Sequence, residues 1–187
     1  MVLTLLIICF AGSAILGGVY LITSAPITAA QLAKVNTALS GVLPAFDNEP
    51  FEEAYDLEVD GQTVKMYPAT LDGTPVGIAV EVITAKGFGG PIQVMVGFLP
   101  EGTIYNTALV LHSETPGLGD KLDPVKSDFS LQFKGKKPGN FKLAVKQDGG
   151  SVDAITAATI SSRAFCDAVD LAYKAFKKIR FEEGGQS

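Results

Sequence analysis

The sequence predicts an α+β fold in which a single N-terminal transmembrane helix precedes a mainly antiparallel sheet packed with helices. Residues 1–22 form an uncharged apolar run, and the chain has a positive mean hydropathy. Short β-branched segments joined by tight turns occupy the middle of the chain, and an amphipathic helical pattern lies near its end. With 187 residues and a formal net charge of −5, the chain suits one ordinary domain with an apolar extension.

The apolar run, MVLTLLIICFAGSAILGGVYLI, predicts a transmembrane anchor over residues 1–23. About 20 helical residues cross roughly 30 Å of hydrocarbon. A cleaved signal peptide is the main alternative, but its apolar core normally has about 7 to 15 residues. The best small-residue cleavage site, Ala25, is also followed by Pro26, which disfavours cleavage.

Small residues recur at helical spacing inside this anchor. Ser13 and Gly17 are four residues apart, as are Ala14 and Gly18. This spacing lets helix backbones approach closely in lipid and favours a helical membrane partner. Glycine is also common in membrane helices in general, so both interpretations stay open.

The two cysteines predict neither a disulfide nor a metal site. Cys9 lies in the anchor, and Cys166 lies in the predicted domain that follows. The two are expected to be too far apart for a disulfide bond. Lipid attachment through Cys9 is disfavoured because Ile8 stands where a small residue is required. The only histidine, His112, cannot form a histidine metal site by itself.

Residues 24–60 are predicted to be a connecting helix followed by an acidic loop. The helix has apolar residues at helical spacing, and Gly41 and Pro44 are its stop signals. These apolar positions are Leu32, Val35, Leu39 and Val42. The stretch FDNEPFEEAYDLEVDG is then predicted to be a loop.

Two hairpins are predicted at the start of the third region, residues 61–187. From Thr63, β-branched residues flank the turn signal Leu71-Asp72-Gly73. A second pair of strands is expected at Ile92–Phe98 and Ile104–His112, joined across Pro100-Glu101-Gly102. Sequential strands with short connections favour an antiparallel sheet over βαβ units.

The rest of this region is expected to contain a loop, a short helix, two strands and a long helix. The loop HSETPGLGDKLDP precedes SDFSLQF, which predicts the short helix, and the strand candidates are FKLAVKQ and SVDAI. Helical spacing of apolar residues from Phe165 to Ile179 predicts a helix from about Ser161 to Lys178. Its late lysines suit the negative end of the helix dipole.

Two glycine-bearing loops are candidates for a functional site. AKGFGGPI, at residues 85–92, lacks the Gly-Lys-Ser/Thr ending of a P-loop, and its glycines favour close backbone approach. HSETPGLGDK, at residues 112–121, could present backbone amides to a flat ring, because Gly117 and Gly119 leave room for one. A tight surface turn explains the second loop equally well.

A third candidate is DAITAATISS at residues 153–162, just before the long predicted helix. Its four hydroxyls belong to Thr156, Thr159, Ser161 and Ser162. Unpaired N–H groups and partial positive charge at a helix N-terminus favour a phosphate. Ser and Thr are also preferred helix caps, so capping alone is the competing explanation.

The stretch DAITAATISSRA resembles the flavin-attachment motif of the FMN-binding domain family. In that motif an Asp is followed by a Ser/Thr-Gly-Ala-Thr core, and the last Thr hydroxyl is esterified to the FMN phosphate. Asp153 matches the Asp and Thr156 the Ser/Thr. Ala158 matches the Ala and Thr159 the flavinylated Thr. Ala157 stands where the family usually has glycine, which adds a methyl group and removes none of the reactive chemistry.

The order of the motifs resembles the G subunit of Rnf-type electron-transport complexes. GFGGPIQVMVGF, HSETPGLGDK, SDFSLQFKGK and DAITAAT follow one another as expected of that family, after a single anchor. The C subunit of the sodium-translocating NADH:quinone reductase is the runner-up. It is typically longer and usually carries Gly rather than Ser before ETPGLG, so Ser113 favours the Rnf-type subunit.

The resemblance implies an electron carrier with FMN covalently bound through Thr159. The ring would rest against the ETPGLG loop, and no catalytic or metal-ligating residue is expected. Cofactor-binding residues implied in that loop are Glu114, Thr115, Gly117 and Leu118. The complex of the family couples ferredoxin:NAD oxidoreduction to sodium or proton translocation.

The resemblance also implies a location and partners. The chain would be a single-pass protein of the inner (cytoplasmic) membrane, with an extracytoplasmic FMN-binding domain at residues 61–187. Its partners would be other membrane subunits and, during maturation, a flavin transferase, with no nucleic acid. Two alternatives of other classes are a cofactor-free membrane-anchored scaffold module and a flavin-dependent reductase that acts alone.

Overall fold

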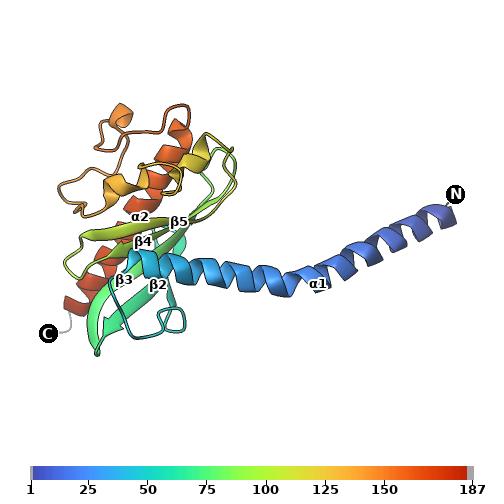
Figure 1. Cartoon of the computed structure of the whole chain (residues 1–187), viewed down its shortest axis with the longest axis horizontal. Helices are drawn as coiled ribbons and strands as arrows, with labels where there is room; N and C mark the ends of the chain where they lie inside the picture. Colours follow the sequence, from blue (N-terminus) through green and yellow to red (C-terminus); the bar gives the residue numbers. More distant parts are fainter. Residues whose placement is uncertain (1, 185–187) are drawn as a thin grey trace. The chain divides into compact units, whose positions relative to one another are not determined.

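A computed structural model of the chain describes residues 2–184 (Figure 1). Residue 1 of the predicted anchor and residues 185–187 of the predicted domain lie outside this range. The chain divides into two compact units between Asn36 and Thr37. The first unit consists of most of helix α1 (Val2–Val42), and the second holds the end of that helix and all the remaining elements.

Helix α1 joins the predicted anchor and the predicted connecting helix into one element. It continues through Pro26 and ends at Val42, beside the predicted stop signals Gly41 and Pro44. An 18-residue window of α1 has a mean hydropathy of 2.4. By length and composition, α1 can therefore cross a membrane.

The second unit is built on a five-stranded antiparallel sheet in which strands adjacent in sequence are adjacent in space (Figure 1). This arrangement confirms the predicted α+β class and the antiparallel pairing. The strands are β1 (Tyr55–Val59), β2 (Gln62–Leu71), β3 (Thr74–Thr84), β4 (Ile92–Phe98) and β5 (Ile104–His112). The last two have the bounds that the sequence predicts.

Two Asp-Gly turns set the register of the first three strands. Asp72 and Gly73 have φ of 51° and 72°, and Asp60 and Gly61 have φ of 51° and 74°. Two successive residues with positive φ form the type I′ turn that suits a two-residue hairpin. The turn at Asp72-Gly73 confirms the predicted β2–β3 hairpin.

The turn at Asp60-Gly61 joins β1 to β2. Because β1 lies within the stretch FDNEPFEEAYDLEVDG, the prediction that this whole stretch is a loop was wrong. Leu57 and Val59 pack toward the core, whereas Asp56 and Glu58 are exposed. Charged residues are common on an edge strand, where they discourage pairing with another chain. The acidic composition therefore concealed a short edge strand.

The segment after β5 differs more from its prediction. The short helix is confirmed as the 3₁₀ helix η2 (Ser130–Phe133), but the strands FKLAVKQ and SVDAI were predicted wrongly. Within the described chain they share a single parallel bridge, between Val145 and Val152, beside the 3₁₀ helix η3 (Lys146–Asp148). A parallel ladder needs a crossover of about a dozen residues or more, and the connection here is too short.

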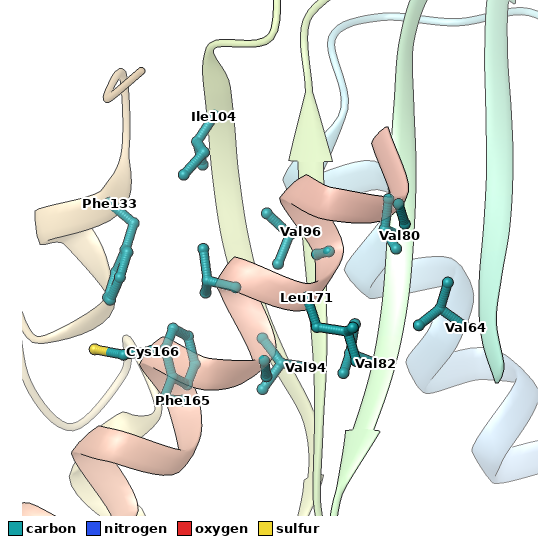
Figure 2. Packing of buried hydrophobic residues seen from close by; sticks show 14 of the residues in the cluster. Val64, Val80, Val82, Val94, Val96, Ile104, Phe133, Phe165, Cys166 and Leu171 are labelled. Carbon is teal, nitrogen blue, oxygen red and sulfur yellow. The ribbon is translucent and has the colours of Figure 1, made fainter. Parts of the chain in front are cut away.

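Helix α2 (Thr159–Gly184) packs across one face of the sheet. Figure 2 shows valines of β2, β3 and β4 facing Phe165 and Leu171 of α2, with Phe133 beside them. Cys166 is buried in the same layer, and burial is the main cause that raises the pKa of its thiol to about 12. Both cysteines are free.

Helix α2 begins two residues before the predicted start and extends beyond the predicted end. Thr159 is its first residue, so Thr159, Ser161 and Ser162 lie in the first turn instead of before the helix. On the other face of the sheet, the C-terminal end of α1 lies against β4. A Cβ added at Gly97 would overlap the carbonyl oxygen of Val42, so this contact requires glycine.

Candidate functional site

Three segments that are far apart in the sequence meet around one cleft of about 340 Å³. They are the loop between β3 and β4, the loop after β5, and the start of α2. The lining residues are Phe88, Glu114, Thr115, Leu118, Gly119, Ala157, Ala158, Thr159, Ile160 and Ser161. These segments are the three sites that the sequence singles out.

Six of the predicted site residues line this cleft together. They are Glu114, Thr115, Leu118, Ala157, Ala158 and Thr159. Phe88, Ile160 and Ser161 also line the cleft and were not among the predicted site residues, although Ser161 belongs to the hydroxyl-rich motif. These three residues line the cleft because of the way the three segments meet. No local sequence pattern predicts that arrangement.

The other three predicted residues do not line the cleft. Asp153 and Thr156 line a neighbouring hollow, and Lys146 lies 2.7 Å from the Asp153 carboxylate. The backbone N–H of Asp153 donates to Gln132 Oε1 at 2.8 Å. Gly117 has φ of 80° and forms the turn that leads into the 3₁₀ helix η1 (Gly119–Leu122).

The hydroxyls at the start of α2 have different roles. Ser162 is fully buried, accepts a hydrogen bond from the N–H of Ile155 at 3.0 Å and donates one to the carbonyl of Ala158 at 3.0 Å. Ser162 therefore ties the preceding loop to the helix. Thr159 is half-buried, and within residues 2–184 its hydroxyl has no hydrogen bond. Neither bond caps an N–H of the first turn, but both occupy the Ser162 hydroxyl, whereas Thr159 lines the cleft.

Ala157 has φ of 62°, in the left-handed region. This conformation is costly for residues with a Cβ and easy for glycine. The turn at this position therefore explains why the motif usually carries glycine. The alanine here adopts the same left-handed backbone with some strain.

Glu114 is buried beside the cleft, with an exposed fraction of 5%. Its backbone N–H donates to Nδ1 of His112 at 3.2 Å, and its Oε2 accepts a hydrogen bond from the Ser161 hydroxyl at 2.7 Å. The Oε1 atom is buried and has no hydrogen-bond partner among the described residues. The bond from Ser161 links the ETPGLG loop to the first turn of α2.

The glycines around Glu114 make room for its carboxyl group. A Cβ added at Gly119 would overlap the carboxyl group, and one added at Gly87 would lie 2.6 Å from Oε1. At Gly89, an added Cβ would overlap the backbone of Ser113. The close backbone approach predicted for residues 85–92 is thus present.

An ion pair supports the turn below the cleft. Lys126 Nζ lies 2.8 Å from Oδ2 of the buried Asp120 carboxylate. This hydrogen bond, followed by one from the backbone of Gly117, lowers the pKa of Asp120. The pair fixes η1 immediately after the residues that line the cleft. Among residues 2–184, no cluster of three or more His, Cys, Asp or Glu side chains could hold a metal ion.

Comparison with known proteins matches residues 87–174 to the FMN-binding domain family. These residues include all that line the cleft. Three similar proteins are each named as the G subunit of an ion-translocating oxidoreductase complex.

The protein of Vibrio atlanticus is 36% identical, over 89% of this chain and 84% of its own length. The protein of Cereibacter sphaeroides is 34% identical, over 86% and 75%. That of Erwinia tasmaniensis is 45% identical over 56% of this chain and 51% of its own.

Proposed function

The chain belongs to the family of the G subunits of ion-translocating oxidoreductase complexes, and we propose that it is a membrane-anchored subunit that carries electrons on FMN. The anchor is α1, which is long and apolar enough to cross a membrane. The FMN site is the cleft at the start of α2. The match to the FMN-binding domain family favours this function over a cofactor-free scaffold.

The chemistry of the cleft suits a planar flavin ring with a phosphate at one end. Phe88, Leu118 and Ile160 provide apolar surface, and each of these side chains is exposed. Such surface can pack against a flat aromatic ring. The first turn of α2 offers N–H groups and partial positive charge, which stabilise a phosphate.

The covalent bond is proposed from the position of Thr159. This residue lines the cleft as the first residue of α2, while the hydroxyls of Ser161 and Ser162 are engaged in hydrogen bonds. A phosphoester at Thr159 would hold FMN where a freely dissociating cofactor would be lost. Thr159 is then a tether, and Asp153, Thr156, Ala157 and Ala158 would form the surrounding attachment motif.

Bound FMN supplies reversible electron transfer. The chain's own residues bind and orient it. The Glu114 loop and the start of α2 both line the cleft, and the exposed side chains of Phe88, Leu118 and Ile160 would leave part of the ring accessible to a partner's cofactor. We expect no independent catalytic site, because relaying electrons requires close approach of cofactors and no nucleophile or proton-transfer pair.

The proposed organisation assigns residues 1–23 to the anchor, 24–60 to a connector and 61–187 to the FMN-binding domain. The domain would lie on the extracytoplasmic side of the inner membrane, among other membrane subunits. A flavin transferase would attach FMN there. The complete complex would couple ferredoxin:NAD oxidoreduction to sodium or proton translocation.

The test is to purify the full chain after co-expression with a flavin transferase and to compare it with Thr159→Ala. We expect the wild type to show a flavin-sized mass increase and in-gel fluorescence after denaturation, and the variant to show neither. Thr74→Ala is a matched control because it removes an exposed threonine hydroxyl at the start of β3, outside the attachment motif, and should keep its flavin. Flavin retained in Thr159→Ala would show that the attachment site is wrong, and a bare wild-type protein would favour the scaffold function.

A further inference from the structure

The hydrogen-bonded pair of Ser161 and Glu114 forms a polar group buried at the cleft. The exposed fractions are 1% for Ser161 and 5% for Glu114, and the two oxygens lie 2.7 Å apart. A hydroxyl that donates to one carboxylate oxygen restricts the orientation of the whole group. The second oxygen, Oε1, remains buried without a partner among the described residues.

Three separate segments leave space for this carboxyl group. Gly87 and Gly119 flank it, and a Cβ at either position would crowd its oxygens. Ser161 approaches from α2. A buried acceptor that keeps an unpaired oxygen is costly. Its retention in a ligand-binding cleft indicates a role toward the ligand.

The charge around the cleft is one-sided. Among the described residues that line it, Glu114 is the only one with an ionisable side chain, and no Lys, Arg or His lines it. Lys126 is paired with Asp120 at 2.8 Å, and Lys86 is paired with Asp167 at 2.7 Å. Ser161, which donates to the carboxylate, lies in the first turn of α2, where the helix carries partial positive charge.

We propose that Ser161 positions the Glu114 carboxylate so that its negative charge lowers the reduction potential of the flavin in the cleft. This inference rests on the proposed FMN site. A reduced flavin carries additional electron density, and a negative charge held close to it on a buried side chain disfavours that state. Glu114 acts by its charge, and Ser161 is a positioning residue that acts through Glu114.

The test measures the midpoint potential of the flavinylated full chain in detergent by spectroelectrochemical titration. Glu114→Gln removes the charge with little change of shape, and we expect an upward shift of the potential. Glu101→Gln is the matched control, because Glu101 lies in the turn at the other end of β5, and we expect it to have the wild-type potential. An unchanged or lowered potential in Glu114→Gln would overturn the proposal.

A double-variant cycle tests the positioning role of Ser161. Introduced into the wild-type chain, Ser161→Ala should shift the midpoint potential of the flavin. Introduced into the Glu114→Gln variant, it should leave that potential unchanged. Equal shifts in both backgrounds would show that Ser161 does not act through Glu114. If Glu114→Gln is not recovered with flavin, Glu114→Asp keeps the charge on a shorter side chain and should give a smaller upward shift.

The result also separates this inference from the proposed function. Flavinylated variants with unchanged potentials would refute the role of the pair and leave the electron carrier intact. A wild-type chain that carries no flavin under the same conditions would refute the proposed function itself.

Discussion

The sheet and the segment that links β5 to α2 are stabilised in different ways. In the sheet, alternating side chains and Asp-Gly turns are local features, and the strands follow them closely. In the linking segment, residues 113–158, the backbone depends on distant partners, such as the hydrogen bonds between Gln132 and Asp153 and between Glu114 and Ser161. The cleft is lined by part of this linking segment, by the loop between β3 and β4 and by the start of α2. The sheet therefore follows from local sequence features, whereas the site depends on contacts between distant residues.

The largest effect is expected from opening a cavity in the layer between the sheet and α2. Phe165 is fully buried, and Phe165→Ala should lower the free energy of unfolding by about 3–5 kcal/mol. Chemical denaturation of the full chain in detergent measures this change. Phe88 is 68% exposed in the cleft loop, so Phe88→Ala should change stability by less than about 0.5 kcal/mol. Equal losses in the two variants would contradict the division into a structural layer and a site loop.

A smaller effect is expected where the linking segment is closely packed. Gly119→Ala would bring a Cβ onto the Glu114 carboxyl group and should destabilise the chain by about 1–3 kcal/mol. Gly139→Ala is the matched control, because an added Cβ there meets nothing within 4 Å. Thermal unfolding of both variants would compare them, and a neutral Gly119→Ala would mean that Glu114 is not confined as described.

The strained turn before α2 predicts a gain in stability. Ala157→Gly relieves a left-handed alanine at φ of 62° and should stabilise the chain by about 0.5–1 kcal/mol. Ala154 has no positive φ, and Ala154→Gly should be destabilising because glycine adds only unfolded-state entropy there. A loss of stability in Ala157→Gly, measured by the same denaturation, would contradict the strain.

The smallest effect concerns acid stability. The pKa of Asp120 is lower in the folded chain than in the unfolded chain, chiefly through its hydrogen bond with Lys126. Its contribution to stability is therefore present above the unfolded pKa of about 3.9 and is lost as the pH falls through the folded pKa. Lys126→Met should make the melting temperature fall less steeply below about pH 4. An unchanged acid slope would show that the pair does not stabilise η1.

Particular residues show how far the sequence can predict this fold. The turn Asp72-Gly73 and the strands Ile92–Phe98 and Ile104–His112 were predictable because periodicity and turn chemistry act within a few residues. Strand β1 was missed because its alternating apolar residues lie among acidic ones. The turn signal Asp60-Gly61 could have revealed it.

The site was predictable as motifs and not as an arrangement. The hydroxyl-rich motif and the ETPGLG loop both line the cleft, but neither pattern shows that Ser161 donates to Glu114. Ser161 and Ser162 are adjacent and chemically alike. Ser162 accepts a hydrogen bond from the backbone N–H of Ile155, whereas Ser161 donates one to the side chain of Glu114, 47 residues away. Such partners follow from tertiary packing, which a single sequence does not encode in any local pattern.

Peptide mapping by mass spectrometry of the natively matured chain would show whether FMN is bound through Thr159. We expect the peptide containing Thr159 to carry the mass of an FMN phosphoester, and fragmentation to place it on that residue. The same peptide found unmodified, in cells with an active flavin transferase, would refute covalent attachment at Thr159.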